Sequence, residues 1–179
     1  MSAFRFCPSC ATPLELIPKQ EDGGWVERLR CVACDWTHWN PTPVLAGIVQ
    51  YQGKILLARN AAWTGRRFAL ITGFMEAGES PQEGVTREIA EETNLQVSAL
   101  QLVGVYDFQR MNQVIIAYHA VADGEIKLSP ELAEYKLYKP EDVICWPAGT
   151  GFAVGDWLRT QGIEPRFMSW EERAAQNIE

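Results

Sequence analysis

A glycine-rich loop that leads directly into a helix crowded with carboxylates constrains this chain more than any other feature. The loop reads Gly73-Phe-Met-Glu-Ala-Gly-Glu79, and after seven residues the chain continues as Arg87-Glu-Ile-Ala-Glu-Glu-Thr-Asn-Leu95. At about 100° per helical residue, Glu88, Glu91 and Glu92 share an arc of roughly 100°. Such like charges repel, so we expect a divalent cation with oxygen ligands between them. A solvent-exposed acidic helix is the alternative.

The ends of this helix can be predicted from the flanking residues. Ser80 is a good N-cap, Pro81 suits the first helical position, and Glu83 completes a capping box with the serine. Asn94 tolerates the left-handed conformation in which many helices end. The sequence therefore predicts a helix over residues 81–93.

The spacing of these residues resembles a family signature. Glycine, five residues, glutamate, seven residues and then R-E-I-A-E-E-T-N-L closely resemble the signature of the Nudix hydrolases, which ends in R-E-U-x-E-E-x-G-U, where U is apolar. The chain departs from it only at the last glycine, which is Asn94 here, and asparagine tolerates the same backbone conformation. The resemblance implies hydrolysis of a nucleoside diphosphate linked to another group.

The resemblance also implies roles for individual residues. In this family water attacks phosphorus in a pyrophosphate, assisted by a pair or trio of Mg²⁺ or Mn²⁺ ions. Arg87 matches the family arginine that orients the loop glutamate, Glu79. The implied ligands of the catalytic ions are Gly73, through its backbone carbonyl, Glu88, Glu91 and Glu92.

Two loops offer candidates for the general base, and the sequence does not decide between them. Glu79 is one candidate, and a later loop, which often supplies this carboxylate in the family, offers Glu131 and Glu134 in Ser-Pro-Glu-Leu-Ala-Glu-Tyr. We favour Glu134, because its Glu-Tyr-Lys-Leu-Tyr setting resembles the E-x-x-W/Y strand of relatives. A surface charge at a strand edge is the alternative interpretation of this residue.

Four cysteines near the start of the chain predict a second metal site. Cys7-Pro-Ser-Cys10 and Cys31-Val-Ala-Cys34 are separated by twenty residues, the spacing of a four-thiolate zinc site. A hairpin with a turn at Gly23-Gly24 would complete a zinc ribbon, in which Zn²⁺ is structural. Disulfides or unligated thiols are the alternatives. The fifth cysteine, Cys145, is expected in the core rather than as a nucleophile.

After the cysteine pairs the pattern changes to alternating strands and helices. A turn is expected at Gln52-Gly53 and a second helix at 151–160. The predicted strands are 44–50, 54–59, 68–71, 95–106, 114–122 and 134–138. This order favours an α/β fold with a mixed sheet covered on both faces, and the resemblance implies the Nudix α/β/α sandwich. We divide the chain into a zinc ribbon (1–40), a Nudix hydrolase domain (41–162) and a tail (163–179) whose structure is not predicted.

Composition limits the other classes of function. The chain has 179 residues, of which 47% are hydrophobic, and a net charge of −7. It contains neither a run of about 18 apolar residues nor a signal-peptide pattern, so we expect a cytoplasmic protein that does not enter membranes. The negative charge argues against broad nucleic-acid binding. A small anionic nucleotide remains compatible, because bound metal ions reverse the local field.

The combination of ribbon and signature narrows the substrate. It is similar to the NADH pyrophosphatase branch of the family and to plant enzymes that cleave FAD and ADP-ribose. The NADH enzymes carry S-Q-P-W-P-F-P-x-S shortly after the signature, whereas residues 103–113 of this chain lack both the prolines and the tryptophan. We therefore expect a dinucleotide or nucleotide sugar such as ADP-ribose, FAD or an NAD(H)-like compound, and this segment gives no support to a preference for NADH. The candidate substrate contacts are the aromatic residues Phe68, Tyr106 and Phe108, which would stack on a ring, and Arg110, which would reach a phosphate or ribose.

Two other functions remain open. The ribbon would make the chain an RNA-binding protein, or an enzyme acting on NAD-capped RNA, if Trp25, Trp36 and Trp39 stack on bases. A non-catalytic scaffold, with the ribbon serving dimerisation, is the other, although the complete glutamate set argues against it. The relatives imply a homodimer.

Overall fold

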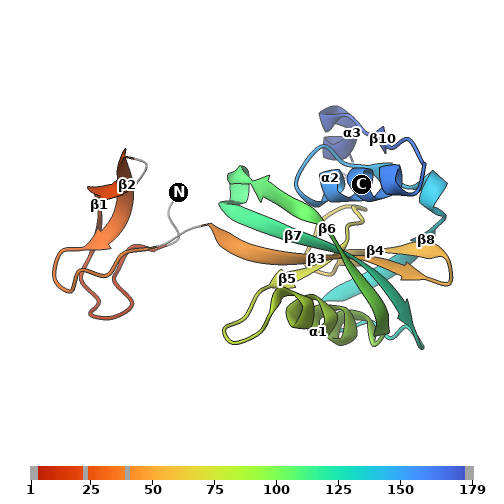
Figure 1. The fold of residues 1–179 in the computed structure, drawn as a ribbon, viewed down its shortest axis with the longest axis horizontal. Helices are drawn as coiled ribbons and strands as arrows, with labels where there is room; N and C mark the ends of the chain where they lie inside the picture. The colour runs from red at the N-terminus through yellow and green to blue at the C-terminus, as the bar shows by residue number, and fades with distance from the viewer. Residues whose placement is uncertain (1–3, 22–23, 39–40, 176–179) are drawn as a thin grey trace. The chain divides into compact units, whose positions relative to one another are not determined.

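The computed structural model describes residues 4–21, 24–38 and 41–175. The chain forms two compact units, Met1–Pro41 and Thr42–Glu179 (Figure 1). In the first unit, strands β1 (Leu14–Glu21) and β2 (Gly24–Cys31) pair as an antiparallel hairpin. The predicted hairpin between the cysteine pairs is therefore present. Of its predicted turn, Gly23 lies outside the described residues.

The second unit contains a six-stranded sheet. Its strands are β3 (Thr42–Tyr51), β4 (Lys54–Asn60), β5 (Ile71–Phe74), β6 (Gln96–Phe108), β7 (Gln113–Asp123) and β8 (Leu132–Tyr138). The order is β6-β7-β3-β4-β8, and β5 also pairs with β3. Strands β3 and β7 run parallel, whereas the other pairs are antiparallel. The sheet is mixed, as the sequence predicts.

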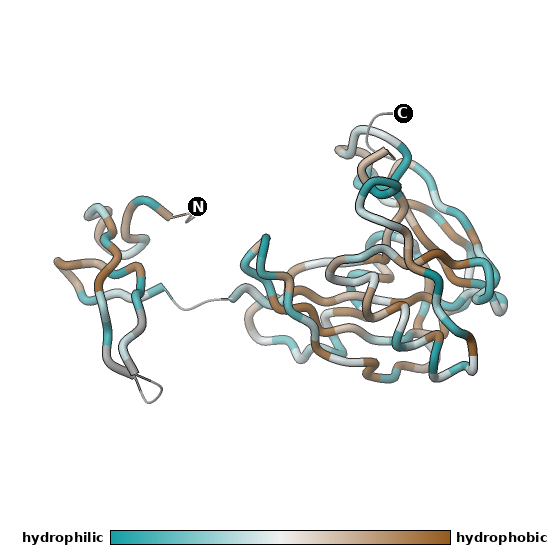
Figure 2. The backbone as a smooth tube through the Cα atoms, turned by 90° about the horizontal axis from the view of Figure 1, so that it is seen from above, coloured by the Kyte–Doolittle hydropathy of each residue, from teal (hydrophilic) through white to brown (hydrophobic). Residues whose placement is uncertain are grey.

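Two helices cover opposite faces of this sheet (Figure 1). They are α1 (Pro81–Thr93) and α2 (Thr150–Thr160). The central strand β3 is buried on both sides: Val44, Ala46 and Ile48 belong to the core that includes α2, and Leu45 and Val49 to the core that includes α1. Burial on both faces explains its continuous apolar sequence. Figure 2 shows hydrophobic residues concentrated along the strands of this unit. The expected α/β/α sandwich is confirmed.

The ends of α1 have the predicted chemistry. The hydroxyl of Ser80 accepts a hydrogen bond from the N–H of Glu83, whose carboxylate in turn accepts one from the N–H of Ser80. At the other end Asn94 has a φ of 62°, a left-handed conformation that asparagine tolerates better than most residues. A capping box and an asparagine C-cap thus fix both boundaries of the helix.

The hairpin turn is correct, but one strand is displaced from its prediction. Gln52 and Gly53 have φ values of 50° and 75°, typical of a tight turn between antiparallel strands. The strand predicted at 68–71 instead runs from Ile71 to Phe74. Residues 68–70 are apolar because they are buried in the core, whereas pairing with β3 begins only at Ile71.

The segment after α2, for which the sequence predicts no structure, forms two short elements. Strand β10 (Arg166–Phe167) pairs with β9 (Ile144–Cys145), and α3 (Trp170–Ala175) follows. Two 3-10 turns, η1 (Gln109–Met111) and η2 (Pro140–Asp142), precede β7 and β9. Cys145 is fully buried, and burial raises the pKa of its thiol to about 11, in agreement with a core position. No helix in the described parts of the chain is long and apolar enough to cross a membrane.

Candidate active site

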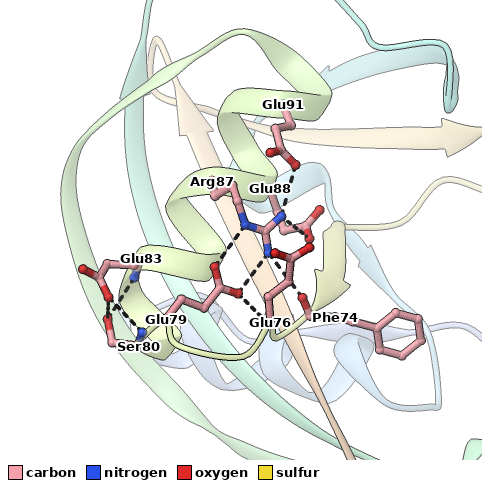
Figure 3. A network of polar contacts seen from close by, with 8 residues as sticks. All are labelled: Phe74, Glu76, Glu79, Ser80, Glu83, Arg87, Glu88 and Glu91. Carbon is pink, nitrogen blue, oxygen red and sulfur yellow. Dashed lines mark hydrogen bonds and ion pairs between the residues drawn. The ribbon is translucent and has the colours of Figure 1, made fainter.

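Arg87 of α1 ties the glycine-rich loop to the helix (Figure 3). Its Nε and Nη2 atoms donate hydrogen bonds of 3.0 and 2.9 Å to the two carboxylate oxygens of Glu79. Nη2 also donates to the carbonyl oxygen of Phe74, and the N–H of Glu76 donates to Glu79 at 2.7 Å. Arg87 and this N–H hold the pKa of Glu79 below its ordinary value. Glu79 is thus an ionised anchor for the loop.

The third nitrogen of Arg87 contacts two glutamates of its own helix. Nη1 donates to Glu88 at 2.8 Å and to Glu91 at 3.1 Å. The side chain of Glu88 is 15% exposed, whereas that of Glu91 is 61% exposed. One guanidinium therefore contacts three carboxylates and offsets part of their mutual repulsion, and these contacts raise its own pKa.

Gly73 of β5 leaves the space that Glu88 occupies. A Cβ atom at this position would lie 1.9 Å from the carboxylate carbon of Glu88 and 2.0 Å from Oε1. Because non-bonded carbon atoms do not approach that closely, any other residue at position 73 would displace the glutamate. The glycine lets the carboxylate lie directly against the strand backbone.

Glu92, near the end of α1, is a buried carboxylate with only 9% of its surface exposed. Burial raises its pKa to about 7, and the charges of Glu88, Glu131 and Glu91 act in the same direction. Each of these causes disfavours the ionised form. A cation bound among these residues would favour the ionised form instead.

A second segment is attached to the end of α1 by backbone hydrogen bonds. The N–H of Lys127 donates to the carbonyl of Thr93 at 2.9 Å. The N–H of Ser129 donates to the carbonyl of Glu92, also at 2.9 Å. These bonds bring Glu131 to the same pocket as Glu92.

The carboxylates line one pocket of about 470 Å³, which we call the carboxylate pocket. Its lining residues are Val44, Thr72, Gly73, Phe74, Glu76, Arg87, Glu88, Glu91, Glu92, Gln113 and Glu131. Five carboxylates and one guanidinium suit a hard divalent cation, which prefers oxygen ligands. In the described part of the chain the glutamate oxygens do not converge within 4.8 Å as a set, so these side chains would rotate to hold an ion.

Glu134 lies outside the carboxylate pocket, although it is three residues from Glu131. It sits on β8 opposite Arg59 of β4 and accepts a 2.8 Å hydrogen bond from the Nε of that arginine. It lines a separate hollow that also includes Phe68 and Lys136. Of the two glutamates in Ser-Pro-Glu-Leu-Ala-Glu-Tyr, Glu131 is therefore the one beside Glu92.

A second pocket, of about 450 Å³, adjoins the carboxylate pocket through Val44, Thr72 and Gln113, which line both. We call it the aromatic compartment. Its aromatic and basic lining residues are Trp63, Phe108, Trp146, Trp170, Arg67, Arg110 and Arg173. Phe108 and Arg110 are thus placed beside the carboxylates. No motif marks the three tryptophans, which come from separate loops and from α3.

The other two aromatic candidates lie elsewhere. The hydroxyl of Tyr106 donates to Asp156 of α2 at 2.9 Å, and burial, followed by this contact, raises its pKa. Phe68 lies under Lys136, whose Nζ is 4.4 Å from the ring centroid. Neither ring lines the carboxylate pocket or the aromatic compartment.

The four N-terminal cysteines form a cluster in the first unit. Their sulfur atoms lie within 4.8 Å of one another, and the shortest separations are 3.4 Å. A tetrahedral zinc ion with bonds of 2.3 Å requires about 3.8 Å between sulfurs. The two pairs share a conformation, since the N–H groups of Ser9 and Ala33 donate to the sulfurs of Cys7 and Cys31 at 3.4 Å. The donor set fits one zinc ion.

The tryptophans considered for base stacking differ in their surroundings. Trp25 is 72% exposed. The ring of Trp36 stacks on His38, with centroids 6.0 Å apart. Trp39 lies outside the described residues.

Sequence comparison finds similarity over most of the chain. The family model of the NUDIX domain matches residues 41–159. An NAD-capped RNA hydrolase NudC of Pseudomonas putida is 30% identical over 152 residues, which cover 83% of this chain and 53% of that protein. The NudC protein of Mycobacterium tuberculosis is 35% identical over 107 residues, covering 58% of this chain and 33% of that protein. The chain thus spans about half the length of the Pseudomonas relative, and less of the mycobacterial one.

Solved structures with the same fold include two from bacteria. A NUDIX hydrolase from Nitrosomonas europaea matches with a TM-score of 0.68 and 25% identity, over 92% of this chain and 97% of that one. An ADP-ribose pyrophosphatase from Streptococcus suis matches with a TM-score of 0.56 and 19% identity, over 72% of this chain and 99% of that one. The second likeness concerns the fold alone.

Proposed function

The chain belongs to the Nudix hydrolase family, and from this premise we propose that it hydrolyses the pyrophosphate bond of a nucleoside diphosphate derivative. The observation that carries the proposal is the carboxylate pocket, which Glu88, Glu92 and Glu131 line together with Gly73. A pocket of this charge would repel a pyrophosphate unless it held cations. The proposed reaction is therefore metal-dependent.

The family implies a divalent metal, and we assign Mg²⁺ or Mn²⁺ to this pocket. The proposed ligands are Glu88 and Glu92, with Glu91 and the carbonyl of Gly73. When bound, the metal supplies positive charge to the phosphates and lowers the pKa of the attacking water. Arg87 keeps Glu88 against β5 and, through Glu79, holds the loop in place.

Glu131 is the general base that we propose, in place of Glu134. A base must lie within reach of the attacking water, and Glu131 shares the pocket of the proposed metal ligands. Both oxygens of Glu79 are engaged by Arg87, which stabilises its ionised form and makes it a weak base. Glu134 is paired with Arg59 outside the pocket.

The pH–rate profile distinguishes the two loop glutamates. Glu131→Gln should lose the acidic limb of the profile and most turnover, because its carboxylate can no longer accept the proton. Glu134→Gln is the matched control, and it should keep both the acidic limb of the profile and the wild-type turnover. A lost limb in Glu134→Gln, with a normal profile in Glu131→Gln, would reverse the assignment.

The substrate that we propose is a dinucleotide or nucleotide sugar such as ADP-ribose, FAD or an NAD(H)-like compound. The support is the aromatic compartment, whose Phe108 and Arg110 can contact a base and its ribose or phosphate next to the carboxylates. These residues belong to the segment 103–113 that lacks the NADH-type motif. Hydrolysis of NAD-capped RNA is the second candidate, because the Pseudomonas and Mycobacterium relatives are named for that activity.

A panel assay tests this proposal. NADH, NAD, ADP-ribose, FAD, diadenosine polyphosphates and NAD-capped RNA are incubated with Mg²⁺ or Mn²⁺, and the products are identified by mass. Glu88→Gln and Glu92→Gln should remove most turnover without unfolding the protein. Glu83→Gln, on the same helix but outside the pocket, is the control. Wild-type rates in both pocket variants would refute the assignment.

For the first unit we propose one structural Zn²⁺ held by Cys7, Cys10, Cys31 and Cys34. Homodimerisation and a cytoplasmic location remain predictions. Gel filtration with light scattering tests the first of them, and fractionation of the source cells tests the second.

A further inference from the structure

Two of the arginines that line the aromatic compartment, Arg67 and Arg173, lie against its tryptophans. The guanidinium carbon of Arg67 lies 5.3 Å from the ring centroid of Trp63, and that of Arg173 lies 5.2 Å from the ring centroid of Trp146. The Nε of Arg67 is buried and has no hydrogen-bond partner among the described residues. A buried donor without an acceptor is costly, so an anionic ligand at this position would stabilise the arrangement.

The cationic surface continues into a neighbouring hollow of about 300 Å³. Trp146 and Arg173 line both spaces. The titratable residues of the second hollow are Arg66, Lys136, Tyr138, Asp142 and Arg173. One carboxylate thus faces three cations there, in a chain whose net charge is −7. Burial and the charge of Arg67 lower the pKa of Arg173 to about 10, as expected where two guanidiniums face each other.

The two ends of the connected pockets have opposite charges. The carboxylate pocket, which suits metal-bound pyrophosphate, meets the aromatic compartment at Val44, Thr72 and Gln113. Arg173 lines both the aromatic compartment and the second hollow, so the basic lining continues from one space into the other. A ligand that followed this path would have pyrophosphate at one end, a ring among the tryptophans and an anion beyond it.

We propose that Arg66, Arg67, Lys136 and Arg173, which we call the distal basic site, bind a phosphate group that the substrate carries in addition to its pyrophosphate. This inference rests on the proposed function and specifies the class of substrate. Arg173 lines both spaces and joins Arg67 of the aromatic compartment to Arg66 and Lys136 of the hollow. Such cations suit a phosphate, because it carries up to two charges and can accept paired N–H bonds from a guanidinium. The phosphate would be a monoester on a coenzyme ribose or the first phosphodiester of a nucleic-acid chain.

Matched substrate pairs test the distal basic site and separate its two sources of phosphate. The coenzyme pairs are NADH with NADPH and dephospho-coenzyme A with coenzyme A. The third pair is NAD with a short RNA that carries NAD at its 5′ end. We expect a higher kcat/KM for the phosphorylated member of at least one pair. A preference only in the third pair assigns the site to a phosphodiester, and a preference in the coenzyme pairs assigns it to a monoester.

Variants and direct binding provide the second readout. Arg67→Gln should lower the ratio of kcat/KM values between paired substrates by about tenfold or more, the effect of losing a hydrogen bond to a charged group. Lys136→Gln, an exposed position, should act in the same direction if Arg67→Gln does not fold. Arg159→Gln, which pairs with Asp156 on α2, is the control and should leave the ratio unchanged.

Calorimetry with adenosine 2′,5′-bisphosphate and AMP, at equal Mg²⁺, separates this inference from the proposed function. Tighter binding of the bisphosphate, lost in Arg67→Gln, supports the distal basic site even if no substrate is hydrolysed. Hydrolysis without preference in any pair, together with equal binding of the two nucleotides, overturns the distal basic site and leaves the proposed function standing.

Discussion

Replacing Glu92 by glutamine should stabilise the protein at neutral pH in the absence of Mg²⁺ and Mn²⁺, even though it removes a proposed ligand. Glu92 is buried, and burial, with help from Glu88, Glu131 and Glu91, raises its pKa from 4.5 to about 7. Ionising this carboxylate is therefore harder in the folded protein than in the unfolded chain. Glutamine has a similar shape but no charge, so it avoids this cost.

The sign and size of the effect follow from linkage. Below pH 4.5 Glu92 holds its proton in both the folded and the unfolded state, and the stability that its protonated form gives the folded protein is fully present. As the pH rises toward 7 the unfolded chain releases its proton first, so the free energy of unfolding falls. The shift in the pKa of Glu92 from 4.5 to about 7 corresponds to a loss of roughly 1–3 kcal/mol in the free energy of unfolding. A metal ion bound at Glu92 would favour the ionised form and restore stability at neutral pH.

Urea unfolding at about pH 5 and about pH 8 measures this difference. The buffer contains no Mg²⁺, Mn²⁺ or chelator, so that the zinc proposed for the first unit is undisturbed. Wild type should lose stability relative to Glu92→Gln as the pH rises. Glu83→Gln is the control. Hydrogen bonds from Ser80 lower the pKa of Glu83, so this carboxylate is ionised in both states across the range, and the difference in stability between this variant and wild type should not change with pH. Equal stability of wild type and Glu92→Gln at both pH values would refute the reasoning.

Three further predictions follow from the same contacts. Gly73→Ala places a Cβ 1.9 Å from the carboxylate carbon of Glu88. Turnover should therefore fall by about 10²-fold, with little change in melting temperature. A near-normal kcat would contradict this. Arg87→Lys cannot reproduce the paired bonds to Glu79, so it should lower both kcat and Tm, whereas wild-type values would show that the pairing is dispensable. Cys10→Ser should reduce zinc per chain, measured by elemental mass spectrometry, and unchanged zinc content would exclude a four-thiolate site.

The parts of the fold that the sequence predicts best are those determined within a few residues. Ser80, Pro81 and Glu83 start α1, and Asn94 ends it, through contacts inside one helical turn. The cysteine pairs likewise form local turns, each stabilised by N–H bonds to a sulfur. Local hydrogen bonding therefore explains why the two motifs proposed to bind metal can be recognised from their spacing alone.

Contacts between distant segments could not be predicted in the same way. Glu131 and Glu134 lie in one short motif, and only the pairing of β8 with β4, together with the attachment of Ser129 to α1, separates them. The aromatic compartment depends in the same way on Trp63, Trp146 and Trp170, which come from three segments far apart in sequence. Strand register and long-range packing decide both, and neither leaves a motif.

The dependence of hydrolysis on metal and on Glu88 tests the central claim most directly. Mn²⁺ is titrated into dialysed protein with ADP-ribose, or with whichever panel compound the wild type cleaves, and release of the mononucleotide is followed by mass spectrometry. Release should rise with Mn²⁺ to saturation in the wild type and fall by about 10²-fold or more in Glu88→Gln. Equal release by both proteins, or release that does not depend on the ion, would contradict the account.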